Sequence, residues 1–91
     1  MNNQLVNWRK QIDVIDGKII SHLAKRMEIT RAIGKYKKKH NISLLDKKRW
    51  QEIINLHQKT SENLGLSKKF VKDILNLIHE YSLKIQEKLH E

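Results

Sequence analysis

The chain has 91 residues, enough for one small domain, which we expect to span residues 1–91. It has no cysteine, which excludes a disulfide framework and thiolate chemistry. Lysine and arginine number 19 against 10 aspartate and glutamate residues, and the formal net charge of +9 favours an anionic partner: nucleic acid, a membrane surface or an anionic metabolite.

Helix-forming residues dominate the chain, proline is absent, and no segment alternates polar and apolar residues as a strand does. These features predict an all-α fold. The N-terminal residues are polar, and no apolar run approaches the length of a membrane span. We therefore expect a soluble cytoplasmic protein that does not bind a membrane.

The first predicted helix is long. It should start after Asn2 or Asn3, either of which can cap it, and run to about Lys39. Gly17 and Gly34 fall inside it, and each costs roughly 1 kcal/mol relative to alanine, which suggests close approach of another helix. Residues at helical spacing form its apolar stripe: Leu5, Trp8, Ile12, Ile15, Ile19, Leu23, Thr30 and Ile33.

Two shorter helices should follow, each with a recognisable start. Asp46 is a good N-cap for the second helix, which should end near Asn63, before Gly65. Ser67 is predicted to cap the third helix. The apolar stripe of that helix consists of Phe70, Val71, Ile74, Leu75, Leu77, Ile78, Tyr81, Ile85 and Leu89.

The length of the first helix raises a packing problem. About 37 residues at 1.5 Å each give roughly 55 Å, whereas a compact monomer of this size has a radius of gyration near ~12 Å. The apolar stripe continues along the projecting part, so this part needs cover. We predict an interlocked homodimer, and the alternative is a kink at Gly17 or Gly34 that folds the helix back.

Polar residues lie on the inward stripes of the first and third helices. At about 100° per residue, Arg26 and Lys37 follow Ile19 along one face, roughly 16 Å apart, so their long side chains can converge on one small ligand. Arg9 lies about 100° around the helix from Arg26 and about 25 Å away, so it suits the partner chain's pocket. The third helix places Ser82 and Gln86 one turn apart on its inward row.

For any one of these side chains, the more common explanation is that it reaches from the edge of the apolar stripe to water. Together, and with Arg49 at the start of the second helix, they favour a cationic pocket for a small molecule with several carboxylates, because unpaired buried polar groups are costly. The histidines show no metal-ligand spacing, and we expect them at the surface: His22, His40, His57, His79 and His90.

The lysine-rich end of the first helix, residues 35–39, is better explained as a solvated helix terminus than as a nucleic-acid patch. A phosphate-binding surface needs exposed charges, whereas Arg26 and Lys37 of the predicted pocket lie on an apolar stripe. The sequence also lacks a glycine-rich phosphate loop and a nucleophile–base motif. A basic nucleic-acid-binding or regulatory module remains the alternative to an enzyme.

Segments along the whole chain resemble the all-helical chorismate mutases. Residues 8–16 resemble the opening L-R-x-x-I-D-x-I-D of that family, and residues 46–49 match its D-x-x-R motif. The other matching segments are residues 23–27 (L-L-x-x-R), 33–37 (V-x-x-x-K), 65–71 and 78–86. The resemblance implies three helices per chain in an intertwined homodimer, and the rearrangement of chorismate to prephenate, a [3,3] pericyclic reaction of aromatic amino-acid biosynthesis that needs no cofactor.

The resemblance also implies a role for each site residue. Arg26 and the partner subunit's Arg9 would clamp the two carboxylates of chorismate, and Lys37 and Gln86 would donate hydrogen bonds to the ether oxygen. Three further residues would contribute to the site. Ser82 would bind a carboxylate, Asp46 would bind the ring hydroxyl, and Arg49 would complete the positively charged wall.

One position departs from the family pattern. The family usually continues D-x-x-R with glutamate, a carboxylate that helps hold the ring hydroxyl, and here that residue is Trp50. Either Asp46 suffices, or Glu52 substitutes, or the pocket accepts an altered ring substituent. Trp50 thus leaves 4-amino-4-deoxychorismate mutase activity as an alternative. Isochorismate-pyruvate lyase is a second alternative, because it shares the fold and the pocket chemistry.

Overall fold

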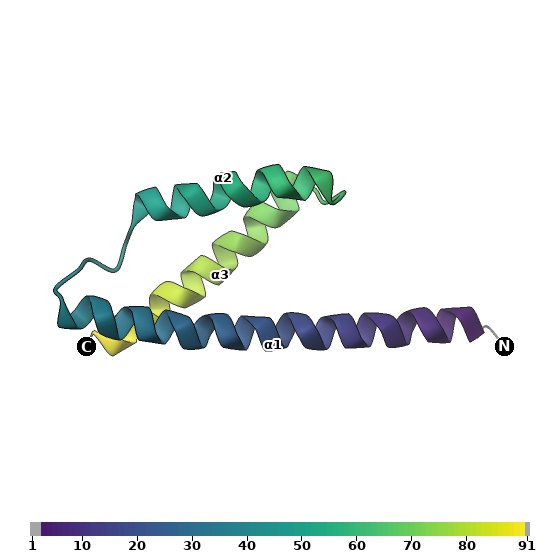
Figure 1. Ribbon diagram of the computed structural model, residues 1–91, viewed down its shortest axis with the longest axis horizontal. Helices are drawn as coiled ribbons and strands as arrows, with labels where there is room; N and C mark the ends of the chain where they lie inside the picture. Colours follow the sequence, from purple (N-terminus) through teal and green to yellow (C-terminus); the bar gives the residue numbers. More distant parts are fainter. Residues whose placement is uncertain (1–2, 91) are drawn as a thin grey trace.

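The computed structural model describes residues 3–90, which form three helices and no strand: α1 (Asn3–Lys39), α2 (Lys47–Asn63) and α3 (Lys68–Leu89) (Figure 1). The all-α prediction is confirmed, and the helix limits agree closely with those expected. Asn3 already lies inside α1, and Asn2, the other candidate cap, is outside the described residues.

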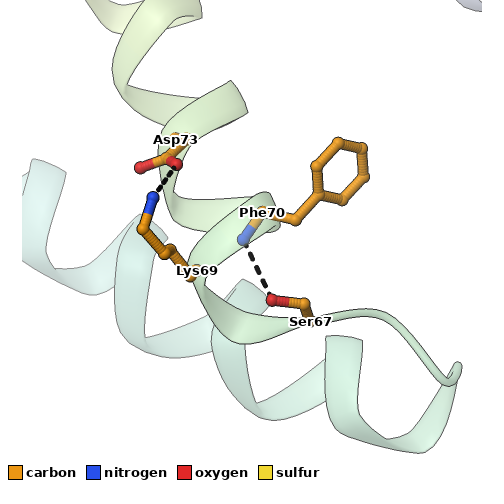
Figure 2. Close-up of polar contacts among 4 residues, drawn as sticks. All are labelled: Ser67, Lys69, Phe70 and Asp73. Atoms are coloured by element: carbon orange, nitrogen blue, oxygen red, sulfur yellow. Dashed lines mark hydrogen bonds and ion pairs between the residues drawn. The ribbon is translucent and has the colours of Figure 1, made fainter.

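Local hydrogen bonds explain where α2 and α3 begin. Asp46 caps α2 by accepting a hydrogen bond from the backbone N–H of Arg49 at 3.0 Å. Ser67 caps α3 in the same way through the N–H of Phe70 at 3.3 Å, and Figure 2 shows this bond at the first turn. Both cap predictions are confirmed, because a short side-chain acceptor satisfies a backbone donor that the helix leaves unpaired.

Two residues with positive φ end the helices. Asn41, with φ of 54°, follows α1 and lets the N–H of Ile42 return to the carbonyl of Lys37 at 2.8 Å. Gly65, with φ of 74°, follows α2 as the sequence predicted. The left-handed conformation suits asparagine and glycine better than other residues.

α1 is one unbroken helix, so neither glycine folds it back. The molecule measures 60 × 25 × 14 Å and its radius of gyration is 17.0 Å, well above the roughly 12 Å of a compact chain of this length. Figure 1 shows α3 running diagonally between α1 and α2, and α3 is the helix that packs against both. The N-terminal part of α1 extends beyond the other two helices.

The apolar stripe of α1 is largely uncovered in this arrangement. Trp8, Ile12, Ile15 and Ile19 are each more than 50% exposed. Among the apolar side chains of the described residues, only Met27 and Ile54 are buried. A single chain therefore leaves most of its apolar surface in water, which is unfavourable by roughly 25 cal/mol per Å².

Close contact between α1 and α3 occurs at Gly34. A Cβ atom there would lie 3.1 Å from Gln86 Cγ and 3.1 Å from Leu89 Cδ1. The prediction of close helix approach is thus confirmed at Gly34, whereas Gly17 has no such neighbour within the described chain. In residues 3–90, no helix is long and apolar enough to cross a membrane.

Candidate active site

A cavity of about 360 Å³ lies between the three helices and the segment that joins α1 to α2. Six of the seven predicted site residues line it: Arg26, Lys37, Asp46, Arg49, Ser82 and Gln86. Its other walls include Ile29, Thr30, Ile33, Leu44, Trp50, Ile53, His79 and Leu83. The helical spacing on α1 and α3 thus brings the unexpected polar residues to one place.

Arg26 is held by Ser82 across the α1–α3 contact. Arg26 Nη1 donates a hydrogen bond to Ser82 Oγ at 2.7 Å, and Ser82 Oγ donates in turn to the carbonyl of Ile78 at 2.8 Å. Ser82 is buried, so this hydroxyl is held in a fixed position. Ser82, predicted to contact a carboxylate of the substrate, thus also orients Arg26, a role that was not predicted from the sequence.

Gln86 and Lys37 occupy the part of the cavity near the end of α1. Gln86 is buried, and its Nε2 donates to the carbonyl of Thr30 at 3.3 Å. Lys37 Nζ donates to the carbonyl of Leu44 at 3.0 Å. An ammonium group has three donors, so Lys37 keeps further donors for a ligand while it is tethered to the connecting segment.

The start of α2 forms the exposed rim of the cavity. The carboxylate of Asp46 already accepts the cap hydrogen bond from Arg49 N–H, but a carboxylate has room for further donors. Arg49 Nη1 lies 3.7 Å from Glu52 Oε2, with both side chains more than half exposed, and such a pair contributes little to stability. Glu52 pairs with Arg49 at this rim and is absent from the residues that line the cavity.

Arg9 is the one predicted site residue that its own chain's cavity does not include. It lies in the N-terminal part of α1 with an exposed side chain. Arg9 precedes Arg26 by seventeen positions, which is about 25 Å of helix. That Arg9 contributes to the cavity of a partner subunit stays a prediction.

Comparison with known protein families identifies the chain. The model of the family chorismate mutase type II matches residues 8–87. The chain belongs to this family. The resemblance read from the sequence is thereby confirmed, and it covers nearly the whole chain, including every residue predicted to form the site.

Curated relatives agree with the family match. The chain is 30% identical over 88 residues to the bifunctional chorismate mutase/prephenate dehydratase of Buchnera aphidicola subsp. Baizongia pistaciae, covering 97% of this chain and 24% of that protein. It is 27% identical over 75 residues (82% of this chain, 20% of the relative) to the T-protein of Enterobacter agglomerans. The T-protein of Haemophilus influenzae is 28% identical over 71 residues (78% and 19%). The chain thus spans at most about a quarter of these relatives.

Trp50, the residue that departs from the chorismate mutase pattern, packs against His79. The Trp50 indole stacks on the His79 imidazole with ring centroids 4.1 Å apart and planes 15° apart, and both rings line the cavity. Burial, assisted by the positive charge of Arg26, lowers the pKa of His79, while Glu80 opposes the shift. This shift favours the neutral form of the imidazole.

His79 is half-buried, and its side chain forms part of the cavity wall, a position for which it was not singled out from the sequence. The spacing held a usable signal, because residues 79, 82 and 86 follow one another at three and four positions on one helix face. What the sequence lacked was the position of Trp50 opposite His79, which depends on how α2 packs on α3.

The charges of the cavity suit a small dianion. Three cationic side chains line it, Arg26, Lys37 and Arg49, against the single carboxylate of Asp46. Arginine binds carboxylates through its planar fork, and neutral donors such as the Gln86 amide can stabilise charge that develops during a reaction. The arrangement can bind, orient and stabilise a dicarboxylate by hydrogen bonds and charge alone.

Proposed function

We propose that this chain is a cytoplasmic chorismate mutase that converts chorismate to prephenate in aromatic amino-acid biosynthesis. The observation that carries the proposal is the convergence of Arg26, Lys37 and Gln86 on one cavity in a member of the chorismate mutase type II family. The excess of two positive charges in that cavity complements the two carboxylates of chorismate. The same observation argues against a nucleic-acid-binding function, because these charges line a small cavity and do not form an exposed surface.

Catalysis of this rearrangement requires a fixed conformation and stabilised charge. Arg26, fixed by its 2.7 Å bond to Ser82, binds one carboxylate and keeps the substrate in its compact reactive conformer. Lys37 and Gln86 donate to the ether oxygen, where negative charge grows as the carbon–oxygen bond breaks. Asp46 binds the ring hydroxyl at the rim, and Arg49 adds positive charge to the cavity wall.

The site is completed by a second copy of the chain. The exposed stripe Trp8, Ile12, Ile15 and Ile19 gains cover if two α1 helices pack together in an intertwined homodimer. Such packing carries the N-terminal part of one α1 across the partner, and the partner subunit's Arg9 then binds the second carboxylate. The homodimer is thus required for the complete set of cations.

An ultraviolet assay with chorismate and isochorismate, run side by side, tests the proposed activity. We expect chorismate to be consumed with formation of prephenate, and turnover of isochorismate to be at least tenfold slower. Arg26→Ala should lower turnover about 10²-fold, the order expected when a substrate is no longer held in its reactive conformer. Lys25→Ala is the matched control, because Lys25 is the exposed neighbour of Arg26 and does not line the cavity.

Turnover of neither compound would contradict the proposed function. Faster turnover of isochorismate, with release of pyruvate, would assign the site to lyase chemistry instead. An equal loss of activity in Lys25→Ala and Arg26→Ala would mean that the cavity does not hold the substrate.

A further inference from the structure

The stacked rings of Trp50 and His79 form a wall of the cavity that the proposed mechanism leaves without a role. The rings come from α2 and α3, respectively, and each side chain is only partly buried. Stacking occupies ring faces and leaves the in-plane nitrogens available for hydrogen bonds. Within residues 3–90, neither the imidazole nitrogens nor the indole N–H has a hydrogen-bonding partner.

The other polar groups of the cavity already have partners or assigned roles. Arg26, Lys37 and Gln86 are directed to the carboxylates and the ether oxygen. The Thr30 hydroxyl donates to the carbonyl of Arg26 at 2.9 Å, and Ser82 is bonded to Arg26. The only polar group of chorismate that remains is the ring hydroxyl. The proposed mechanism gives this hydroxyl to Asp46 beside the start of α2, and a hydroxyl has room for a second partner. His79 of α3, which stacks on Trp50 of α2, is the polar side chain of the cavity that has no other role.

A neutral imidazole suits a hydroxyl group. It offers one donor and one acceptor, and a hydroxyl can both give and accept a hydrogen bond. Burial and the neighbouring Arg26 lower the pKa of His79, which favours this neutral form. Trp50 contributes a flat surface that fixes the plane of the imidazole.

We propose that His79 is a specificity-determining residue that hydrogen-bonds the ring hydroxyl of the substrate, and that Trp50 is a positioning residue that holds it by stacking. The inference rests on the proposed function and deepens it, because it names the substrate group that this wall recognises. It also explains how a site with Trp50 in place of the usual glutamate retains a contact to that hydroxyl.

Two substrates separate this contact from a general effect on activity: chorismate, and an analogue with hydrogen in place of the ring hydroxyl. His79→Phe keeps a flat ring against Trp50 and removes both nitrogens. We expect kcat/KM for chorismate to fall about tenfold in this variant, the usual order for loss of one hydrogen bond to a buried group, and kcat/KM for the analogue to stay within about twofold. His79→Leu removes the nitrogens without an aromatic ring, so whichever of these variants folds should show the same selective loss.

Variants of Trp50 test the positioning role. Trp50→Phe keeps an aromatic partner for His79. The ratio of kcat/KM for chorismate to kcat/KM for the analogue should therefore stay within about threefold of wild type. Trp50→Ala should lower this ratio to the value of His79→Phe. Circular dichroism and sedimentation confirm that each variant is folded and assembled.

The outcomes distinguish this inference from the proposed function. A wild-type protein that converts chorismate, together with a His79→Phe variant that loses both substrates equally or loses neither, would overturn the inference alone. A wild-type protein that converts neither substrate would overturn the proposed function, and the inference with it.

Discussion

Mixing Arg9→Ala protein with Arg26→Ala protein is expected to restore activity that neither variant has alone. Each variant lacks one carboxylate-binding arginine from both sites of its homodimer. The substrate is then poorly positioned, so the activity of each variant should fall to about 10⁻² of wild type. In a heterodimer, one site combines an intact Arg26 from one subunit with an intact Arg9 from the other. Random exchange at equal concentrations gives half heterodimers with one good site each, so roughly a quarter of wild-type activity should return.

The matched control mixes Arg26→Ala with Lys37→Ala. These two residues line the same cavity of one chain, so no heterodimer regains a complete site and the mixture should stay inactive. Subunit exchange is verified with one tagged chain. Absence of recovery after verified exchange would place Arg9 in its own chain's site or outside any site.

Gln86→Glu is expected to make activity depend on pH. Gln86 is buried between α1 and α3 and is proposed to donate to the ether oxygen. A carboxylate there repels the negative charge that develops, so turnover at pH 8 should fall about 10²–10³ below wild type. A protonated carboxyl can donate again, and therefore activity should recover as the pH falls through the pKa of the introduced group, which burial raises.

The pH profiles of wild type and of Gln86→Ala serve as controls. His79 titrates below its ordinary pKa of 6.5, so each variant is normalised to wild type at the same pH. Gln86→Ala has no titratable group at this position and should be slow at every pH. A Gln86→Glu variant as active as wild type at pH 8 would mean that residue 86 does not face the breaking bond.

The helices and their ends were predictable because their determinants are local. Asp46, Ser67 and Gly65 act on backbone groups within one turn of themselves, and those groups need the same partners in any fold. Helical periodicity also sufficed to place Arg26 and Lys37 on one face of α1, and Ser82 and Gln86 on one face of α3.

Features that depend on packing between helices could not be read from the sequence. Gly17 and Gly34 look alike in the chain, yet only Gly34 meets α3, because the crossing point of α1 and α3 decides which glycine is needed. The hydrogen bond from Arg26 to Ser82 and the stacking of His79 on Trp50 could not be predicted for the same reason, because each joins two helices. The homodimer, inferred from the length of the first helix, stays a prediction.

A crystal structure with a stable dicarboxylate mimic of the compact reactive conformer would test the two-chain site most directly. We expect the ligand in the cavity, with one carboxylate on Arg26 and the other on the partner subunit's Arg9. Its ether oxygen should lie within hydrogen-bonding distance of Lys37 and Gln86. A ligand bound outside this cavity, or held there by one chain alone with Arg9 remote from both carboxylates, would contradict it.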